Sequence, residues 1–276
     1  MLRYDNHVHM NELAANPDEF IGRLNATGMT GANVISVPPT GYIFTKESAE
    51  YEARIQSLLA VTKNYPGRLF PMLFIHPDED GILSKVEDAA GRGVSGFKMI
   101  CNNYYVYEDK AMRVLEKIAQ LEKPVLFHSG ILWDGMVSSA YNKPINWECC
   151  LEIPRLRFAL AHCSWPWIDE CIALYGKLRA ARRIRPDNMC QMFIDITPGT
   201  PDIYRKELMT KLHFIGYELD KAVLFGSDSR VQYYGSSAIK GLCDSDDAIY
   251  DELGISEAAK ENIYGHNFLR FHGIEK

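Results

Sequence analysis

The stretch LRYDNHVH, residues 2–9, has the alternation of a β-strand and carries two imidazoles, His7 and His9, two positions apart. Residues i and i+2 of a strand point to the same face, so both rings can reach one ion. A helix would turn them to roughly opposite sides. Neutral imidazole is a common ligand for zinc and its first-row neighbours, so the pair indicates a candidate metal site at the end of this strand.

Seven more short apolar runs follow, and helical patterns lie between most of them. This alternation predicts a parallel sheet with helical crossovers, closed as a (β/α)8 barrel that forms one domain over residues 1–276. A dinucleotide-binding sheet would need a glycine-rich turn after the first strand, and the chain has none there. The predicted strands cover residues 2–9, 31–38, 69–75, 94–100, 124–128, 158–162, 189–196 and 222–228. The predicted helices cover about 17–27, 47–63, 81–91, 109–121, 166–183 and 204–217, and a last helix begins at Ser256.

The net charge and composition of the chain indicate which kinds of molecule it can bind. The net charge is −6 and no basic run stands out, which argues against nucleic acid or an anionic membrane surface and favours a small-molecule substrate. No apolar stretch is long enough to span a bilayer, and the strand-like start leaves no room for a signal peptide. The seven cysteines contain no C-x-x-C pair, so we expect reduced thiols in a cytoplasmic protein. The oligomeric state stays open, a homo-oligomer included.

Polar residues gather at the predicted carboxyl ends of the strands. Five of the eight histidines and three other charged residues lie there: His7, His9, His76, His128, His162, Lys98, Asp195 and Asp228. In a barrel these ends form one rim, where active sites of the fold are found. A structural role alone would scatter the histidines over helices and the tail. The convergence therefore predicts one active site built from several strands.

The residues at this rim match a family pattern. The chain resembles the amidohydrolase superfamily, and more closely its amidohydrolase-related branch, which includes aminocarboxymuconate-semialdehyde decarboxylase and lactonases. The matching segments span nearly the whole chain: Asp5–His9, Gly96–Lys98, Val125–His128, Phe158–His162, Leu224–Asp228 and Asn262–Gly273. The resemblance implies a metal-dependent (β/α)8 enzyme.

The resemblance also assigns roles to the rim residues. It implies that His7, His9, His128 and Asp228 bind one divalent metal ion, and that His162 lies beside it as an acid/base or electrophile. Three imidazoles and a carboxylate suit zinc, with manganese as the alternative. Zinc can lower the pKa of a bound water to about 7, and Asp228 could then carry its proton to a leaving group. Asp228 and His162 are thus the catalytic candidates.

Lys98 admits two interpretations. Binuclear relatives use a carboxylated lysine at the end of the fourth strand to bridge two metals, whereas the branch resembled here has one metal and a lysine near the substrate. We favour one metal, with Lys98 as a cation for an anionic substrate; a second metal would require its carboxylation.

Three further residues are candidate substrate contacts: Trp165, Arg230 and His76. Arg230 could clamp a carboxylate through its planar guanidinium, or lie on the surface as an ordinary arginine. His76 could equally be a hydrogen-bonded strand-end histidine. The chain departs from its relatives at Ser229-Arg230 after Asp228 and at Cys163-Ser164-Trp165 after His162, which leaves the substrate class open.

The expected activity is metal-assisted hydrolysis of a small amide, ester or lactone that bears a carboxylate. Non-oxidative decarboxylation of an aromatic or unsaturated acid is the first alternative, since it would use the same residues. A non-catalytic barrel that binds metal or ligand is the second.

Overall fold

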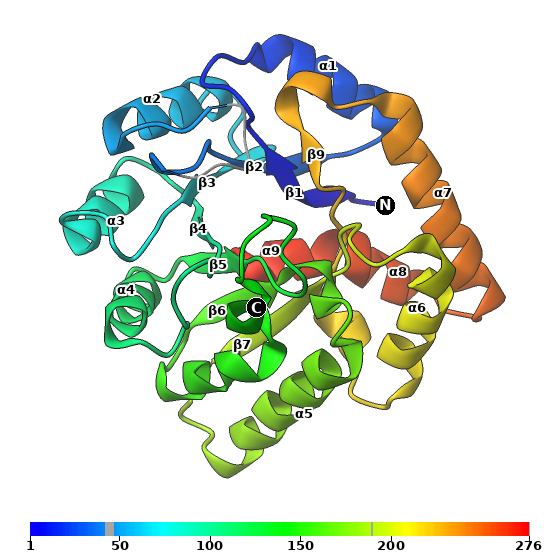
Figure 1. The fold of residues 1–276 in the computed structure, drawn as a ribbon. Helices are drawn as coiled ribbons and strands as arrows, with labels where there is room; N and C mark the ends of the chain where they lie inside the picture. The colour runs from blue at the N-terminus through cyan, green and yellow to red at the C-terminus, as the bar shows by residue number, and fades with distance from the viewer. Residues whose placement is uncertain (42–46, 189, 276) are drawn as a thin grey trace.

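A ring of parallel strands surrounded by helices makes up the described part of the chain, residues 1–41, 47–188 and 190–275 of a computed structural model (Figure 1). The strands are β1 (Tyr4–His9), β2 (Gly31–Ile35), β3 (Leu69–Phe74), β4 (Gly96–Met99), β5 (Pro124–Phe127), β6 (Arg157–Leu160), β7 (Gln191–Asp195), β8 (Val223–Leu224) and β9 (Ser229–Arg230). The helices are α1 (Pro17–Thr27), α2 (Tyr51–Thr62), α3 (Ile82–Gly91), α4 (Asp109–Gln120), α5 (Ile168–Ile184), α6 (Arg205–Phe214), α7 (Ser236–Glu252), α8 (Glu257–Glu261) and α9 (Asn267–Phe271). The predicted α/β barrel is confirmed.

Each strand pairs with its sequence neighbour, from β1 to β8, and β9 returns to pair with β1. The eighth strand, predicted over residues 222–228, covers only Val223–Leu224 in the structure, because the chain bends between β8 and β9. The backbone N–H of Asn6 donates to the Phe225 carbonyl across this bend, at 2.9 Å. The two short strands stand at the two ends of the strand order, and the Asn6–Phe225 hydrogen bond joins the chain between them to β1. Met189, placed in the predicted seventh strand, lies outside the described residues.

The core has two layers because strand residues alternate between the faces of the sheet. One layer lies between the sheet and the helices and includes Val8 and Val34. The other fills the inside of the ring with Tyr4, Phe70 and Phe268. Phe268 belongs to α9, which lies across one end of the ring (Figure 1), and its ring stacks on Tyr4 at 4.5 Å. This end of the ring is closed by apolar side chains.

Helix α1 begins where the sequence predicts a helix start. Asn16 caps α1, because its side chain accepts hydrogen bonds from the backbone of Asp18 and Glu19, as the Asn-Pro-Asp-Glu pattern predicts. Helix α7 was not among the predicted helices, and it packs against α1 and α6.

Among the described helices, none is both long and apolar enough to cross a membrane.

Candidate active site

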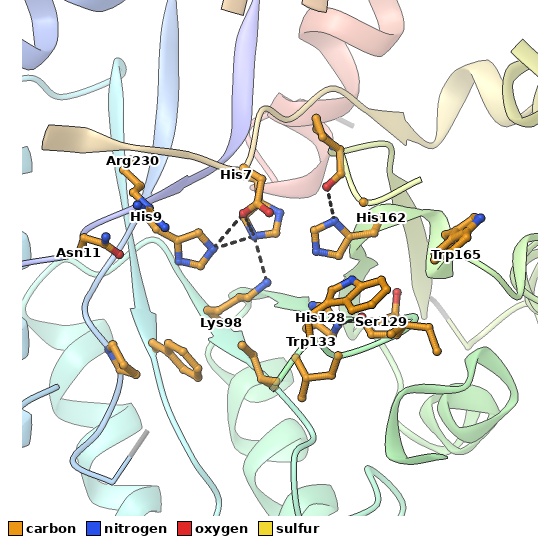
Figure 2. A pocket seen from close by; sticks show the side chains of 18 residues that line it. His7, His9, Asn11, Lys98, His128, Ser129, Trp133, His162, Trp165 and Arg230 are labelled. Carbon is orange, nitrogen blue, oxygen red and sulfur yellow. Dashed lines mark hydrogen bonds and ion pairs between the residues drawn. The ribbon is translucent and has the colours of Figure 1, made fainter. Parts of the chain in front are cut away.

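A cavity of about 290 Å³ opens at the carboxyl ends of the strands (Figure 2). Predicted and unpredicted residues line it together: His7, His9, Asn11, Pro38, Phe74, Lys98, Ile100, His128, Ser129, Ile131, Leu132, Trp133, His162, Trp165, Pro198, Gly199, Asp228 and Arg230. The volume is at the lower end of the range for small-molecule sites. Polar side chains line the cavity on the β1 side and beyond β5 and β6, and aromatic and aliphatic side chains lie between them.

His7 and His9 point into the cavity from β1, as the strand spacing predicts. Their Nε2 atoms lie 3.0 Å apart. Burial is the main cause that lowers the pKa of both imidazoles well below the usual value. Both rings are therefore neutral near pH 7, and a neutral ring can offer a nitrogen lone pair to a cation.

Asp228 completes a compact group with these two rings. Its Oδ1 lies 3.7 Å from Nε2 of His7 and 3.5 Å from Nε2 of His9. The backbone of Asp228 is left-handed, with φ +55°, an uncommon conformation for a residue with a side chain. Asp5 anchors the preceding residue, since its Oδ1 accepts a hydrogen bond from the backbone N–H of Ser227 at 2.9 Å. The strained conformation is thus held by neighbouring structure, as is common at functional sites.

These three side chains fit a divalent metal ion. Their ligand atoms all lie within 4.8 Å of one another, so one ion can touch all three after small adjustments. Two imidazole nitrogens and a carboxylate oxygen are a donor set that zinc and other first-row ions accept. Burial raises the pKa of Asp228 to about 7, an effect that nearby Lys98 opposes. A bound cation would favour the ionised carboxylate in the same way.

His128 lies in the same cavity but apart from this group. Its Nε2 is 3.2 Å from the carbonyl oxygen of Ile131. Its ring packs beside that of His162, with centroids 4.9 Å apart, and His162 in turn lies 5.5 Å from the ring of His7. Among the described residues, the compact group holds three of the four predicted ligands and does not include His128.

Lys98 lies directly beside the predicted metal ligands. Its Nζ is 3.2 Å from Nε2 of His7, and its side chain is buried. Burial lowers the pKa of Lys98 to about 8, although Asp228 and Asp195 favour its charged form. The position suits either interpretation made from the sequence, a cation facing the substrate or a lysine close enough to touch a metal.

His162 is held by an unusual backbone. His162, Cys163 and Ser164 have φ values of +59°, +43° and +58°, three left-handed residues in succession. The Nδ1 of His162 lies 2.8 Å from the Pro198 carbonyl oxygen, which requires Nδ1 to carry the hydrogen. Burial lowers the pKa of this imidazole to about 4. His162 is therefore neutral near pH 7, with an unprotonated Nε2.

Asp195 supports His7 from behind. Its Oδ2 lies 3.3 Å from Nδ1 of His7, on the side of the ring away from Nε2. Asn6 donates to the same oxygen at 2.8 Å, and the backbone N–H of Thr197 donates to Oδ1 at 2.7 Å. Burial raises the pKa of Asp195, and these hydrogen bonds oppose the rise. A carboxylate behind a ligand histidine orients the ring and fixes its tautomer.

The predicted substrate contacts divide into two groups. Trp165 and Arg230 line the cavity, and strand pairing places Arg230 opposite His9. His76 lies in an adjoining hollow, where its Nε2 is 3.0 Å from Oδ1 of Asn103. The structure thus separates His76 from the central cavity.

Among the wall residues that sequence reasoning did not predict, Asn11 and Pro198 show what the sequence can and cannot reveal. Asn11 continues the alternation of His7 and His9 and could have been found from it. The Pro198 carbonyl that binds His162 has no such signal, because a backbone acceptor is not encoded by residue type.

Comparisons with known proteins agree with this fold. The Amidohydro_2 family model, described as amidohydrolase, matches residues 40–274, a range that begins after β1. A probable 2-pyrone-4,6-dicarboxylic acid hydrolase from Acinetobacter baumannii, with citric acid bound, has a TM-score of 0.65 at 13% identity over 99% of this chain and 100% of that one. Amidohydrolase 2 from Bifidobacterium longum subsp. infantis has 0.60 at 16%, over 100% of both chains. Dihydroorotase from Campylobacter jejuni has 0.59 at 15%, over 100% of this chain and 84% of that one.

At these identities the solved structures support the fold alone, and no curated protein sequence matches the chain. The family model covers most of the chain and is the stronger finding. The chain belongs to the Amidohydro_2 family of amidohydrolases.

Proposed function

We propose that this chain is a metal-dependent hydrolase of a small amide, ester or lactone that bears a carboxylate. The observation that carries the proposal is the approach of His7 Nε2, His9 Nε2 and Asp228 Oδ1 to within 3.0–3.7 Å of one another. Membership of the amidohydrolase family supports a hydrolase. The cavity volume of about 290 Å³ supports a small substrate.

In this proposal His7, His9 and Asp228 hold one divalent cation, with zinc preferred and manganese as the alternative. When bound, such a cation supplies Lewis-acid polarisation of a carbonyl oxygen and lowers the pKa of water at the site. Asp228 has a second carboxylate oxygen, which can take a proton from the attacking water and return it to the leaving group.

His162 and His128 have supporting roles in the proposal. The unprotonated Nε2 of His162 makes this residue a proton acceptor in the resting enzyme, so the geometry favours its base role over its role as an electrophile. His128 serves as a fourth ligand only if its ring turns away from the Ile131 carbonyl; otherwise it contacts the substrate.

Cationic groups would bind the substrate carboxylate. Lys98 and Arg230 both line the cavity near His7 and His9, and their charges complement an anion. Trp133 and Trp165 would cover the apolar part of the substrate and limit access of bulk water.

Metal content of tag-free protein, purified without chelators, tests the proposal. We expect about one zinc or manganese per chain, lost in His9→Ala and in Asp228→Ala and retained in the control His76→Ala, whose imidazole lies in the adjoining hollow. Carboxylate-bearing esters, lactones and amides should then be hydrolysed in proportion to metal content. Absence of metal after reconstitution would contradict the proposal, two metals would indicate carboxylated Lys98, and release of CO₂ would indicate the decarboxylase instead.

A further inference from the structure

A line of polar side chains, buried except for a partly buried histidine at its start, runs through the inside of the ring from the end covered by α9 to His7. We call it the buried relay; its members are His272, Asn33, Asn6 and Asp195. The Nε2 of His272 lies 2.8 Å from Oδ1 of Asn33, and Asn33 donates to Oδ1 of Asn6 at 2.9 Å. Asn6 donates to Asp195 at 2.8 Å, and Asp195 lies 3.3 Å from Nδ1 of His7.

A β-bulge in β1 makes the relay possible. Asp5 lies opposite Ala32, but Val8 lies opposite Val34, so β1 contains one residue more than β2 over this interval. Asn6 points into the ring by ordinary alternation from Tyr4. The extra residue lets His7, the next in sequence, also point inward. Without the bulge Asn6 and His7 would lie on opposite faces of the sheet.

Chemistry fixes the direction of every hydrogen bond in the relay. An ionised Asp195 can only accept, so Asn6 must turn its NH₂ group toward Asp195 and its carbonyl oxygen toward Asn33. Asn33 must then present its own NH₂ to Asn6 and its oxygen to His272. Each donor therefore faces Asp195. The Thr197 hydroxyl also donates to Asp195, so its oxygen, 3.2 Å from Nδ1 of His7, can accept from this ring. Both neighbours of Nδ1 are acceptors, and the imidazole of His7 donates from Nδ1. That leaves the lone pair on Nε2, the atom that faces His9 and Asp228.

Packing alone does not explain why two asparagines are buried inside the ring. Asn6 and Asn33 are fully buried within a layer that is otherwise mostly apolar. Burying an amide is unfavourable unless it is hydrogen-bonded, and an apolar side chain could fill the same space. At the far end, His272 packs between Phe70 and Phe268, with ring centroids 4.7 and 4.8 Å away.

We propose that Asn6, Asn33 and His272 are positioning residues that orient Asp195 and thereby hold His7 as its Nδ1–H tautomer, ready to bind a cation through Nε2. None of the three lines the cavity, so they act through Asp195. The effect on metal binding rests on the proposed function, whereas the effect on the His7 tautomer does not.

Zinc affinity, measured by competition with a chromophoric chelator, tests the first effect. We expect Asn33→Leu to weaken zinc binding about 10- to 100-fold, the usual effect of removing an outer-shell partner. Phe70→Leu is the matched control, because Phe70 packs on His272 but contributes no hydrogen bond. It should lower the unfolding temperature and leave zinc affinity within about twofold. Equal zinc affinity in the two variants would overturn the proposal.

A second pair of variants covers the case in which Asn33→Leu does not fold. His272→Phe removes the donor to Asn33, and His272→Gln replaces it with an amide donor. We expect zinc binding to weaken several-fold in the first and to stay near wild type in the second. Equal affinities in this pair would overturn the proposal.

The tautomer itself can be read in metal-free protein by ¹⁵N-histidine NMR, with no dependence on zinc or activity. We expect His7 to carry its hydrogen on Nδ1 in the wild type, and to show a mixture or the Nε2–H form in His272→Phe. Wild-type protein that binds no zinc would contradict the proposed function, yet this spectrum would still decide on the relay. A wild-type Nε2–H form, or an unchanged Nδ1–H form in His272→Phe, would overturn the relay.

Discussion

At the scale of single residues, the Nε2 atom of His7 has two competing partners. Lys98 Nζ lies 3.2 Å from it and can donate a hydrogen bond to it. The lone pair that accepts this hydrogen bond is the one that a metal ion would need. Metal binding therefore requires Lys98 to move away, toward the space where a substrate carboxylate would lie.

Replacing Lys98 by Met tests this competition. We expect Lys98→Met to bind one metal with affinity equal to or greater than wild type, because a cation and a competing donor are removed. The kcat/KM for a carboxylate substrate should fall roughly 30-fold or more, corresponding to about 2 kcal/mol for the lost charge pair. A matched uncharged ester should be hydrolysed as before. Loss of a second equivalent of metal in this variant would identify Lys98 as a bridging ligand.

Gly199 allows a second test at this scale. A Cβ at this position would lie 2.7 Å from Nδ1 of His162, so Gly199→Ala should push the ring away from the Pro198 carbonyl. We expect kcat to fall about 100-fold, as for other small displacements of a catalytic group, with metal content unchanged. Gly241→Ala in α7 is the control, since its Cβ meets no atom within 4 Å, and it should gain up to about 1 kcal/mol. Equal kcat in both variants would exclude the role of His162.

At the scale of elements, Asp5 ties the start of the barrel to the bend before β9. Its Oδ1 accepts from the backbone N–H groups of His7 and Ser227, and its Oδ2 accepts from the Tyr234 hydroxyl at 3.0 Å. One side chain thus holds both segments that carry the proposed metal ligands.

Removing this side chain should weaken both the fold and the site. Asp5→Ala leaves three donors without their acceptor, two of them buried, and we expect the free energy of unfolding to fall by about 3 kcal/mol or more. Tyr234→Phe removes one of these hydrogen bonds and should cost about 1 kcal/mol. Urea denaturation of the two variants measures the difference. Equal losses would show that Asp5 does not act as the common anchor.

The elements also show how far the sequence could be interpreted. The apolar runs predicted where the strands lie. Because barrel strands end at one rim, the sequence also predicted that the polar residues at these ends would meet, and the structure places five of them in one cavity: His7, His9, Lys98, His162 and Asp228. The bulge in β1 could not be predicted, because an extra residue in one strand is visible only against its partner. The separation of His128 from the compact group has a similar origin, since strand ends define a rim but not which atoms meet. Helix α7 was missed although Ile239, Cys243 and Tyr250, which are buried in the structure, recur at helical spacing along its sequence.

At the scale of the whole molecule, buried histidines make stability depend on pH. Burial lowers the pKa of His272 to about 3, with Arg157 and Lys123 acting in the same direction. Below about pH 6.5 the unfolded chain binds a proton at this histidine and the folded protein does not, so the free energy of unfolding falls as the pH falls. Asp5 acts in the opposite direction, since burial raises its pKa to about 6 and the folded state takes up its proton first.

A single variant isolates the His272 contribution. Between pH 8 and pH 5 we expect wild-type protein to lose about 2 kcal/mol of stability through this residue. His272→Gln, which does not titrate, should lose correspondingly less over the same range, as measured by chemical denaturation at each pH. Parallel pH profiles for the two proteins would show that His272 is not held neutral by the fold.

The buried relay also has a consequence for the order in which the protein is made. His7 is synthesised well before His272, which lies in the segment that covers the ring. Domains generally fold as units during synthesis, and contacts between distant residues form late. A nascent chain can therefore shape β1 early, but it cannot complete the hydrogen bonds behind His7 until residue 272 has been added. The cation site would then reach its final geometry only after α9 and His272 have been synthesised and have packed against the ring.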